Sequence, residues 1–226
     1  MLATTRKTRV KAIAAVAMLL CALVPSWASA QATGDEPFDS GWILGQLKQP
    51  APAATPFLEL RESELLEAPM RISGEYRRPD ADTLVRQVSA PYVETTTLKD
   101  GRATIEREGR SPRSFALSRA PELAGLQAGF GALLAGDHAM LEQHYAIGAY
   151  GTAEGWTMTM APRSRDLARR VKSISLFGAG GDLRCIETLT AEDEVQRTLL
   201  GSAALDAAGA DAGDGFLALC RGGTGG

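Results

Sequence analysis

The sequence predicts a mainly β protein of the α+β class, a curved antiparallel sheet with a helical lid over its concave apolar face. Three observations support this prediction. Short strand-like segments separated by turn residues fill 57–117, and a second group fills 145–200. Between the two groups, near 121–144, apolar residues recur at helical spacing. Because the loops within each group are too short for crossovers, neighbouring strands must be antiparallel.

The first thirty residues are predicted to be a cleaved signal peptide. Four basic residues lie between Arg6 and Lys11, an apolar run covers 12–24, and Ala28-Ser29-Ala30 forms a small-x-small cleavage pattern. The apolar run is shorter than the roughly 20 residues of a transmembrane helix. An uncleaved anchor and a lipoprotein signal at Cys21 are the alternatives. We expect an exported chain that is cut after Ala30.

Cleavage changes the charge of the chain. All 27 acidic residues but only 20 of the 24 basic residues lie after Ala30, which leaves a net charge of about −7. Such a chain lacks the basic face that nucleic-acid binding needs. It also lacks a cluster of lysines and arginines that would hold it on anionic lipid. We therefore expect no nucleic-acid partner, and the remaining length suffices for one domain with a sizeable core.

Residues 31–56 are predicted to form an N-terminal helix followed by a proline-rich link. Asp39 or Ser40 can cap this helix. The apolar residues on its predicted buried face are Trp42, Ile43 and Leu47. Prolines between Pro50 and Pro56 end the helix as an extended link. A single β domain at 57–200 follows.

Eleven strands are predicted in this domain. The first six are Phe57–Leu66, Met70–Arg77, Thr83–Val88, Tyr92–Lys99, Arg102–Arg107 and Arg113–Leu117. Asp100-Gly101 suits the positive φ angles of a type I′ hairpin turn. The last five are Tyr145–Tyr150, Trp156–Ala161, Val171–Phe177, Leu183–Thr190 and Val195–Leu200. A basic stretch at 163–170 is expected to be a helical turn or loop.

The insert near 121–144 is predicted to contain two helices, with Pro121 at the start of the first and Asp137 capping the second. Three glycines weaken the first helix by up to about 1 kcal/mol each, so it needs an apolar surface to lie on. The residues expected to line a hydrophobic pocket beneath it are Leu84, Val88, Leu123, Leu126, Phe130, Leu133, Trp156, Met158 and Met160. Methionines suit a pocket for variable apolar ligands. An ordinary filled core is the alternative.

Two cysteines, Cys185 and Cys220, remain after cleavage. An even number in an exported protein favours a disulfide, and a bridge would hold the C-terminal tail at 201–226 on the sheet. Two unpaired thiols are the alternative. The spacing fits neither a redox motif nor a metal site.

Catalytic motifs are scarce. His138 and His144 are six residues apart, which does not place two metal ligands on one helical face. The glycine-rich 177–182 joins two strands and does not open a helix, so it is a turn and not a phosphate loop. Glu59 and its neighbours Glu62 and Glu64 could flank a glycosidic substrate, but exposed aromatics of the kind found in such clefts are few. A hydrolase therefore ranks last among the functions considered, and we expect no enzyme, no metal and no cofactor.

The order of elements and several short motifs resemble the LolA family of periplasmic outer-membrane lipoprotein carriers. The matching motifs are FLELRESELL, SGEYRRPD, LVRQVSAP, LKDGRATIE, WTMTMAPR and KSISLF. The resemblance runs from Gly41 to Leu200 and is closest to a LolA-related branch associated with aryl-polyene and acyltransferase gene clusters. It implies an incomplete antiparallel β-barrel, closed by a helical lid over an apolar cavity that receives acyl chains.

The resemblance also implies a function and one further site residue. Arg78, before Pro79, matches a family arginine that holds the lid in the closed state, and so is a candidate lid latch. The implied function is that of a periplasmic, Gram-negative carrier or chaperone, a monomer that takes the acyl chains of a lipoprotein or similar lipidated molecule towards the outer membrane. An inner-membrane exporter and an outer-membrane acceptor are the implied partners. A non-enzymatic periplasmic scaffold for an acyltransferase or lipid exporter is the alternative.

Overall fold

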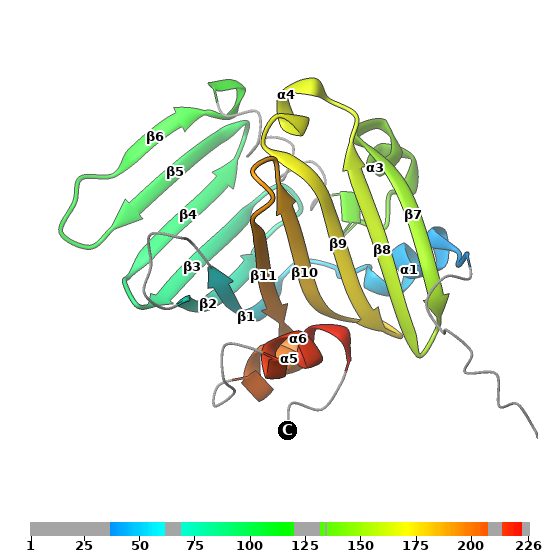
Figure 1. Ribbon diagram of the computed structural model, residues 1–226. Helices are drawn as coiled ribbons and strands as arrows, with labels where there is room; N and C mark the ends of the chain where they lie inside the picture. Colours follow the sequence, from blue (N-terminus) through cyan, green and yellow to red (C-terminus); the bar gives the residue numbers. More distant parts are fainter. Residues whose placement is uncertain (1–36, 62–68, 120–131, 134, 208–213, 223–226) are drawn as a thin grey trace, which may run out of the picture. The chain divides into compact units, whose positions relative to one another are not determined.

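The computed structural model describes residues 37–61, 69–119, 132–133, 135–207 and 214–222 (Figure 1). The predicted signal peptide lies outside these residues. So do three of the predicted pocket residues, namely Leu123, Leu126 and Phe130. No helix within the described residues is long and apolar enough to cross a membrane.

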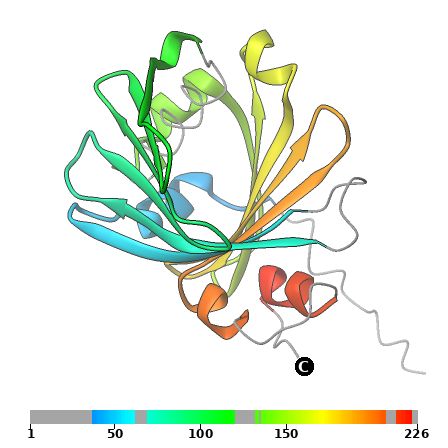
Figure 2. The same ribbon diagram turned by 90° about the vertical axis from the view of Figure 1, so that its left-hand side faces the viewer.

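The described strands form one antiparallel sheet in the order β6-β5-β4-β3-β2-β1-β11-β10-β9-β8-β7. The bounds are β1 Ala53–Arg61, β2 Met70–Arg78, β3 Leu84–Ala90, β4 Glu94–Lys99, β5 Arg102–Arg107, β6 Arg113–Ala116, β7 Tyr145–Thr152, β8 Gly155–Pro162, β9 Val171–Ala179, β10 Asp182–Thr190 and β11 Val195–Leu200. The first and last strands of the chain lie side by side at the centre of this order. Among the described residues β6 and β7 are its two ends and do not pair, so the curved sheet is not closed into a barrel (Figure 2). The predicted open antiparallel sheet is confirmed.

The turn chemistry read from the sequence agrees with the backbone. Asp100 and Gly101 have φ angles of 48° and 68°, as a type I′ turn requires, and β4 and β5 pair on either side of them. The strand predicted to begin at Phe57 instead begins at Ala53, within the expected proline-rich link. Its first four residues pair with β2 alone, because β11 ends at Leu200, opposite Phe57. Pro56 is tolerated there because it needs no N–H towards a second neighbour.

Helices α1 (Ser40–Leu47) and α3 (His138–His144) pack against one side of the sheet, which we call the inner face. Both predicted caps are present. The Asp39 carboxylate accepts a hydrogen bond from the Gly41 backbone, and Asp137 accepts one from Met140. The buried side chains of this cluster, here named the α1 core, are Ile43, Leu44, Leu47, Ala132, Leu133, Leu141, Tyr145, Ala149, Trp156, Met158, Met160, Leu167, Val171, Ile174 and Leu176.

The C-terminal segment packs on the opposite side, the outer face. It contains α5 (Gly201–Asp206) and α6 (Asp214–Arg221), where the sequence indicated only a tail. The predicted disulfide is present, with an S–S distance of 2.01 Å between Cys185 of β10 and Cys220 of α6. The buried residues of this cluster, here named the outer core, are Leu58, Leu60, Cys185, Leu199, Ala203, Ala204, Ala207, Phe216, Leu219 and Cys220. The small residues of α5 allow the helix to lie close to β1.

Two short elements complete the described chain. The 3₁₀ helix η1 (Leu117–Arg119) follows β6, and α4 (Arg165–Ala168) lies between β8 and β9. The helical turn expected in the basic stretch at 163–170 is therefore present as α4. It buries Leu167 in the α1 core.

Candidate functional site

A cavity of about 260 Å³ opens on the inner face, where α1 ends and the first strands begin. Its wall combines apolar side chains from helix and sheet with a few polar ones. The lining residues are Leu47, Gln49, Ala53, Ala54, Thr55, Pro56, Tyr76, Arg77, Arg78, Leu84, Leu133, Gly181, Asp182, Leu183, Leu200 and Gly201. An apolar cavity with a small number of placed polar groups is the usual form of a small-molecule site.

Arg78, the predicted lid latch, lies in the wall of this cavity. One terminal nitrogen of its guanidinium, Nη1, donates a hydrogen bond of 2.7 Å to the carbonyl oxygen of Gln49, just after α1. The arginine therefore ties the inner face of β2 to the chain that leaves α1. The predicted lid contact would involve residues 120–131, outside the described part of the chain, so the latch role stays a prediction.

The corner that follows Arg78 is ordered by Asp80. Its carboxylate accepts hydrogen bonds from the Thr83 hydroxyl at 2.9 Å, the Asp82 backbone N–H at 3.0 Å and the Lys99 ammonium at 3.3 Å. The first two of these bonds are the main reason why the pKa of Asp80 falls to about 2. The ionised carboxylate thus holds the turn between β2 and β3 next to the cavity rim.

The predicted pocket residues lie in several places. Leu84 and Leu133 line the cavity. Trp156, Met158 and Met160 are at most 4% exposed and belong to the α1 core, next to the three buried side chains of α1. Val88 lies in a separate cluster with Phe57, Ile72 and Leu200. The described structure thus brings two of the nine residues to the cavity and places four in packed clusters.

Sequence reasoning missed several residues of the cavity wall. Leu183 and Leu200 belong to strands that were predicted, and period-two alternation was the signal that could have placed them on the inner face. Tyr76 carried the same signal, because it alternates with Met70 and Ile72 in the predicted strand Met70–Arg77. The alternation predicts which face of the strand Tyr76 occupies, but it does not indicate that this part of the face borders a cavity.

A charged cluster adjoins the cavity on the inner face. Glu59 is 5% exposed as a whole residue, and its carboxylate accepts a hydrogen bond of 2.6 Å from a terminal nitrogen of Arg86, as well as one from Arg61. The Arg86 guanidinium lies 4.8 Å from the centre of the Phe57 ring, which in turn lies 4.8 Å from the Tyr76 ring. Glu59 was considered as a catalytic carboxylate from the sequence, whereas Glu62 and Glu64 lie outside the described residues.

The cluster perturbs the acidity of two of its members. Burial is the main reason why the pKa of Tyr76 is raised, although Arg86 opposes the shift. Burial lowers the pKa of Arg86, but the neighbouring Tyr76 and Glu59 raise it by more, so its net shift is upwards. At neutral pH the site therefore presents a phenol and a guanidinium cation in contact.

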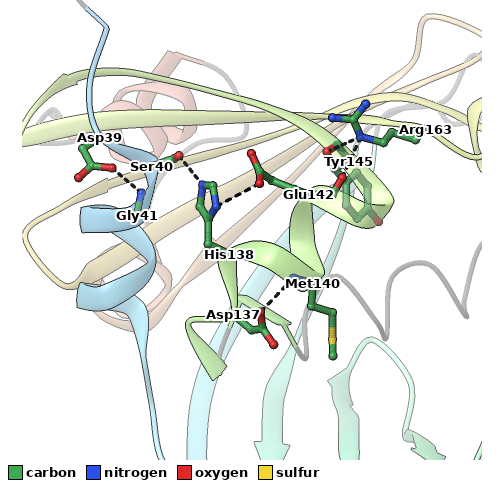
Figure 3. Close-up of polar contacts among 9 residues, drawn as sticks. All are labelled: Asp39, Ser40, Gly41, Asp137, His138, Met140, Glu142, Tyr145 and Arg163. Atoms are coloured by element: carbon green, nitrogen blue, oxygen red, sulfur yellow. Dashed lines mark hydrogen bonds and ion pairs between the residues drawn. The ribbon is translucent and has the colours of Figure 1, made fainter.

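Both histidines of the chain, His138 and His144, lie on α3, and His138 connects this helix to α1 (Figure 3). His138 Nε2 is hydrogen-bonded to the Ser40 hydroxyl at 2.9 Å, and its Nδ1 lies 3.5 Å from a carboxylate oxygen of Glu142. Serine, histidine and carboxylate in this order also occur in catalytic triads. Here the distance between His138 and Glu142 exceeds hydrogen-bonding distance, and none of the three residues lines the cavity. We interpret the contact as a tie between the two helices.

The end of α3 is fastened to the sheet by Arg163. Its Nε donates to the backbone carbonyls of Glu142 at 2.8 Å and Tyr145 at 3.1 Å (Figure 3).

Among the described residues no group of three or more histidine, cysteine, aspartate or glutamate side chains is placed to hold a metal ion.

Comparison with known proteins identifies the family. The model of the family described as "Outer membrane lipoprotein carrier protein LolA-like" matches residues 32–223. The match covers most of the chain, and the chain therefore belongs to the LolA-like family. It extends beyond the predicted resemblance, which ended at Leu200, and includes both helices on the outer face.

A LolA superfamily protein from Nitrosomonas europaea, whose crystal structure is known, aligns with 71% of this chain and 90% of its own, at 9% identity and a TM-score of 0.38. A search of curated proteins gave no significant match.

Proposed function

We propose that this chain is a periplasmic carrier that binds the acyl chains of a lipoprotein or similar lipidated molecule and passes it towards the outer membrane. The observation that carries the proposal is the cavity between the end of α1 and the inner face, with Arg78 in its wall. Membership of a family described as lipoprotein carriers supports it. The chain would act by binding and release, without a catalytic step.

The size of the cavity suggests how binding would proceed. Its 260 Å³ is below the roughly 300–1,000 Å³ of typical ligand pockets, so a long acyl chain needs more room than it provides. Leu133 lines the cavity and also belongs to the α1 core. An acyl chain too long for the cavity would therefore displace the Leu133 side chain first. Each methylene transferred from water would contribute about 0.8 kcal/mol towards this opening.

The test is titration of the purified chain with a fluorescent acyl probe, together with mass spectrometry of lipids that copurify with it. Leu84→Trp would fill the cavity from β3 and should weaken probe binding at least about tenfold. Val85→Trp is the matched control, because the next residue of a strand points to the opposite face. A wild-type chain that binds no probe and yields no lipid would refute the carrier function.

A scaffold function is the second candidate, and one observation favours it. The inner face of β7–β9 is filled by the protein's own side chains, with Trp156 and Met158 at most 2% exposed under α1. A scaffold would keep this packing and bind an acyltransferase or exporter through its surface. Failure to bind acyl probes, combined with stoichiometric copurification of one such membrane protein, would decide for this candidate.

A further inference from the structure

The charged cluster beside the cavity is unusual for the wall of an apolar site. Glu59 and Arg86 belong to β1 and β3, and both project from the same face as Phe57, with which Arg86 makes a cation–π contact. The side chain of Glu59 is 7% exposed and that of Arg86 is 19% exposed. Taking two charges out of water costs more free energy than their attraction usually returns, so an apolar pair of the same volume would stabilise the fold at least as well.

Tyr76 connects this cluster to the cavity. It lines the cavity, lies opposite Arg86 in the pairing of β2 with β3, and interacts with both Arg86 and Glu59. Leu84, two residues before Arg86 on the same strand, also lines the cavity. A ligand that extends along the wall beyond Leu84 and Tyr76 therefore reaches the Arg86 guanidinium next.

The charges of the cluster favour an anionic group. Arg61 and Arg86 both hydrogen-bond to the single carboxylate of Glu59, so the cluster carries one more positive than negative charge. A guanidinium has five N–H donors, of which Arg86 uses one on a terminal nitrogen for Glu59 and another for the Tyr76 hydroxyl. An incoming oxyanion can therefore bind Arg86 without displacing Glu59, while the Tyr76 phenol stays protonated because burial raises its pKa.

We propose that Tyr76, which lines the cavity, forms a polar recognition site with Arg86 and Glu59 beside it. The site selects amphipathic ligands whose apolar chain carries an anionic oxygen group, a carboxylate or a phosphate. Arg86 binds the anionic group, Tyr76 donates a second hydrogen bond, and Glu59 holds the guanidinium in position. This inference rests on the proposed carrier function and adds to it a preference for chains with an anionic group over chains that end in a neutral ester.

The experiment measures displacement of a fluorescent acyl probe by three ligands with the same twelve-carbon chain: dodecanoate, methyl dodecanoate and dodecyl phosphate. At pH 7.5 the wild-type chain should bind one or both anions at least about tenfold more tightly than the neutral ester, as expected for one hydrogen bond to a charged group. The anion that binds more tightly shows whether the site recognises a carboxylate or a phosphate.

Arg86→Met should bring the ratio of anion to ester affinity close to one and leave ester binding within about twofold of wild type. Arg197→Met is the matched control. The side chain of Arg197 is also about one-fifth exposed, and it pairs with the Glu187 carboxylate at 2.8 Å. This pair joins the neighbouring strands β10 and β11 on the outer face, away from the cavity. The ratio of anion to ester affinity in Arg197→Met should equal that of the wild type. If Arg86→Met does not fold, Tyr76→Phe removes one hydroxyl group only and should reduce the same ratio severalfold.

The outcomes separate this inference from the proposed function. Equal binding of ester and anions by the wild type overturns the polar site but leaves the carrier function standing. An equal loss of affinity for all three ligands in Arg86→Met shows a purely structural role and also overturns it. If no ligand displaces the probe, and the probe itself does not bind, the carrier function fails as well.

Discussion

Removal of the disulfide tests how strongly the C-terminal helices contribute to the fold. The perturbation is the double substitution Cys185→Ser and Cys220→Ser, which leaves neither partner of the bridge as a lone thiol. The bridged residues are 35 positions apart. Loop-closure entropy for that separation gives about 4 kcal/mol of stabilisation at 25 °C. Both cysteines are fully buried, so the new hydroxyl groups should add to the loss of stability.

The assay is urea unfolding followed by circular dichroism, with thermal unfolding as a second measurement. A loss of about 4 kcal/mol corresponds to a decrease in Tm on the order of 10 °C for a chain of this size. Oxidised wild type is compared with wild type in reductant and with the double variant. The reduced wild type shows the loss of the covalent link alone, and the double variant should be less stable still because of its buried hydroxyl groups.

Two results would refute this reasoning. Equal stability of the variant and the oxidised wild type would mean that packing of Phe216 and Leu219 alone holds α6 in place. A further loss of stability when reductant is added to the variant would show an effect unrelated to the bridge. Because α6 lies on the outer face, acyl-probe affinity well below Tm should not change in the variant.

Three other predictions concern the cavity rim and the sheet. Arg78→Leu removes the hydrogen bond to the Gln49 carbonyl after α1. Because one such bond contributes about 1 kcal/mol, the acyl probe should be released a few-fold faster in a stopped-flow experiment. An unchanged release rate would exclude a latch. Gly74→Ala should lower the free energy of unfolding by about 1–3 kcal/mol, because its Cβ would lie 1.9 Å from a backbone oxygen of β3. Gly45→Ala, which meets no atom within 4 Å, should be neutral or stabilising in the same urea experiment. Asp80 has a pKa of about 2, below its unfolded value of 3.8, so its contribution to stability is present above the unfolded value and disappears as pH falls towards 2. Thr83→Val should return the Asp80 pKa towards its usual range in an NMR titration, and an unchanged pKa would contradict the assigned cause.

Local signals in the sequence sufficed for much of the fold. The Asp100-Gly101 turn was predictable because few residues adopt positive φ angles at low cost. The bounds of β5 and β11 agree with the sequence prediction, since both strands are flanked by clear turn residues. The N-terminal boundary of β1 did not agree, because the acceptability of Pro56 depends on where β11 ends.

The cavity was only partly predictable. Apolar alternation in β8 correctly indicates one buried face, but it does not state what covers that face. In the structure α1 contributes Leu44 and Leu47 to that cover, whereas the sequence suggested the insert alone. Helix position depends on contacts between residues more than a hundred positions apart, and no local periodicity reports them.

The sequence by itself determined the antiparallel sheet, most strands and turns, the caps of α1 and α3, and the residues available for a disulfide. These features depend on backbone preferences, capping and hydrophobic periodicity, which act over a few residues. Only the tertiary structure decided that the first and last strands meet, that the disulfide fastens α6 to the outer face, and that Glu59 and Arg86 face each other beside the cavity. Each of these depends on strand register between distant segments, which brings side chains together that are unrelated in the linear chain.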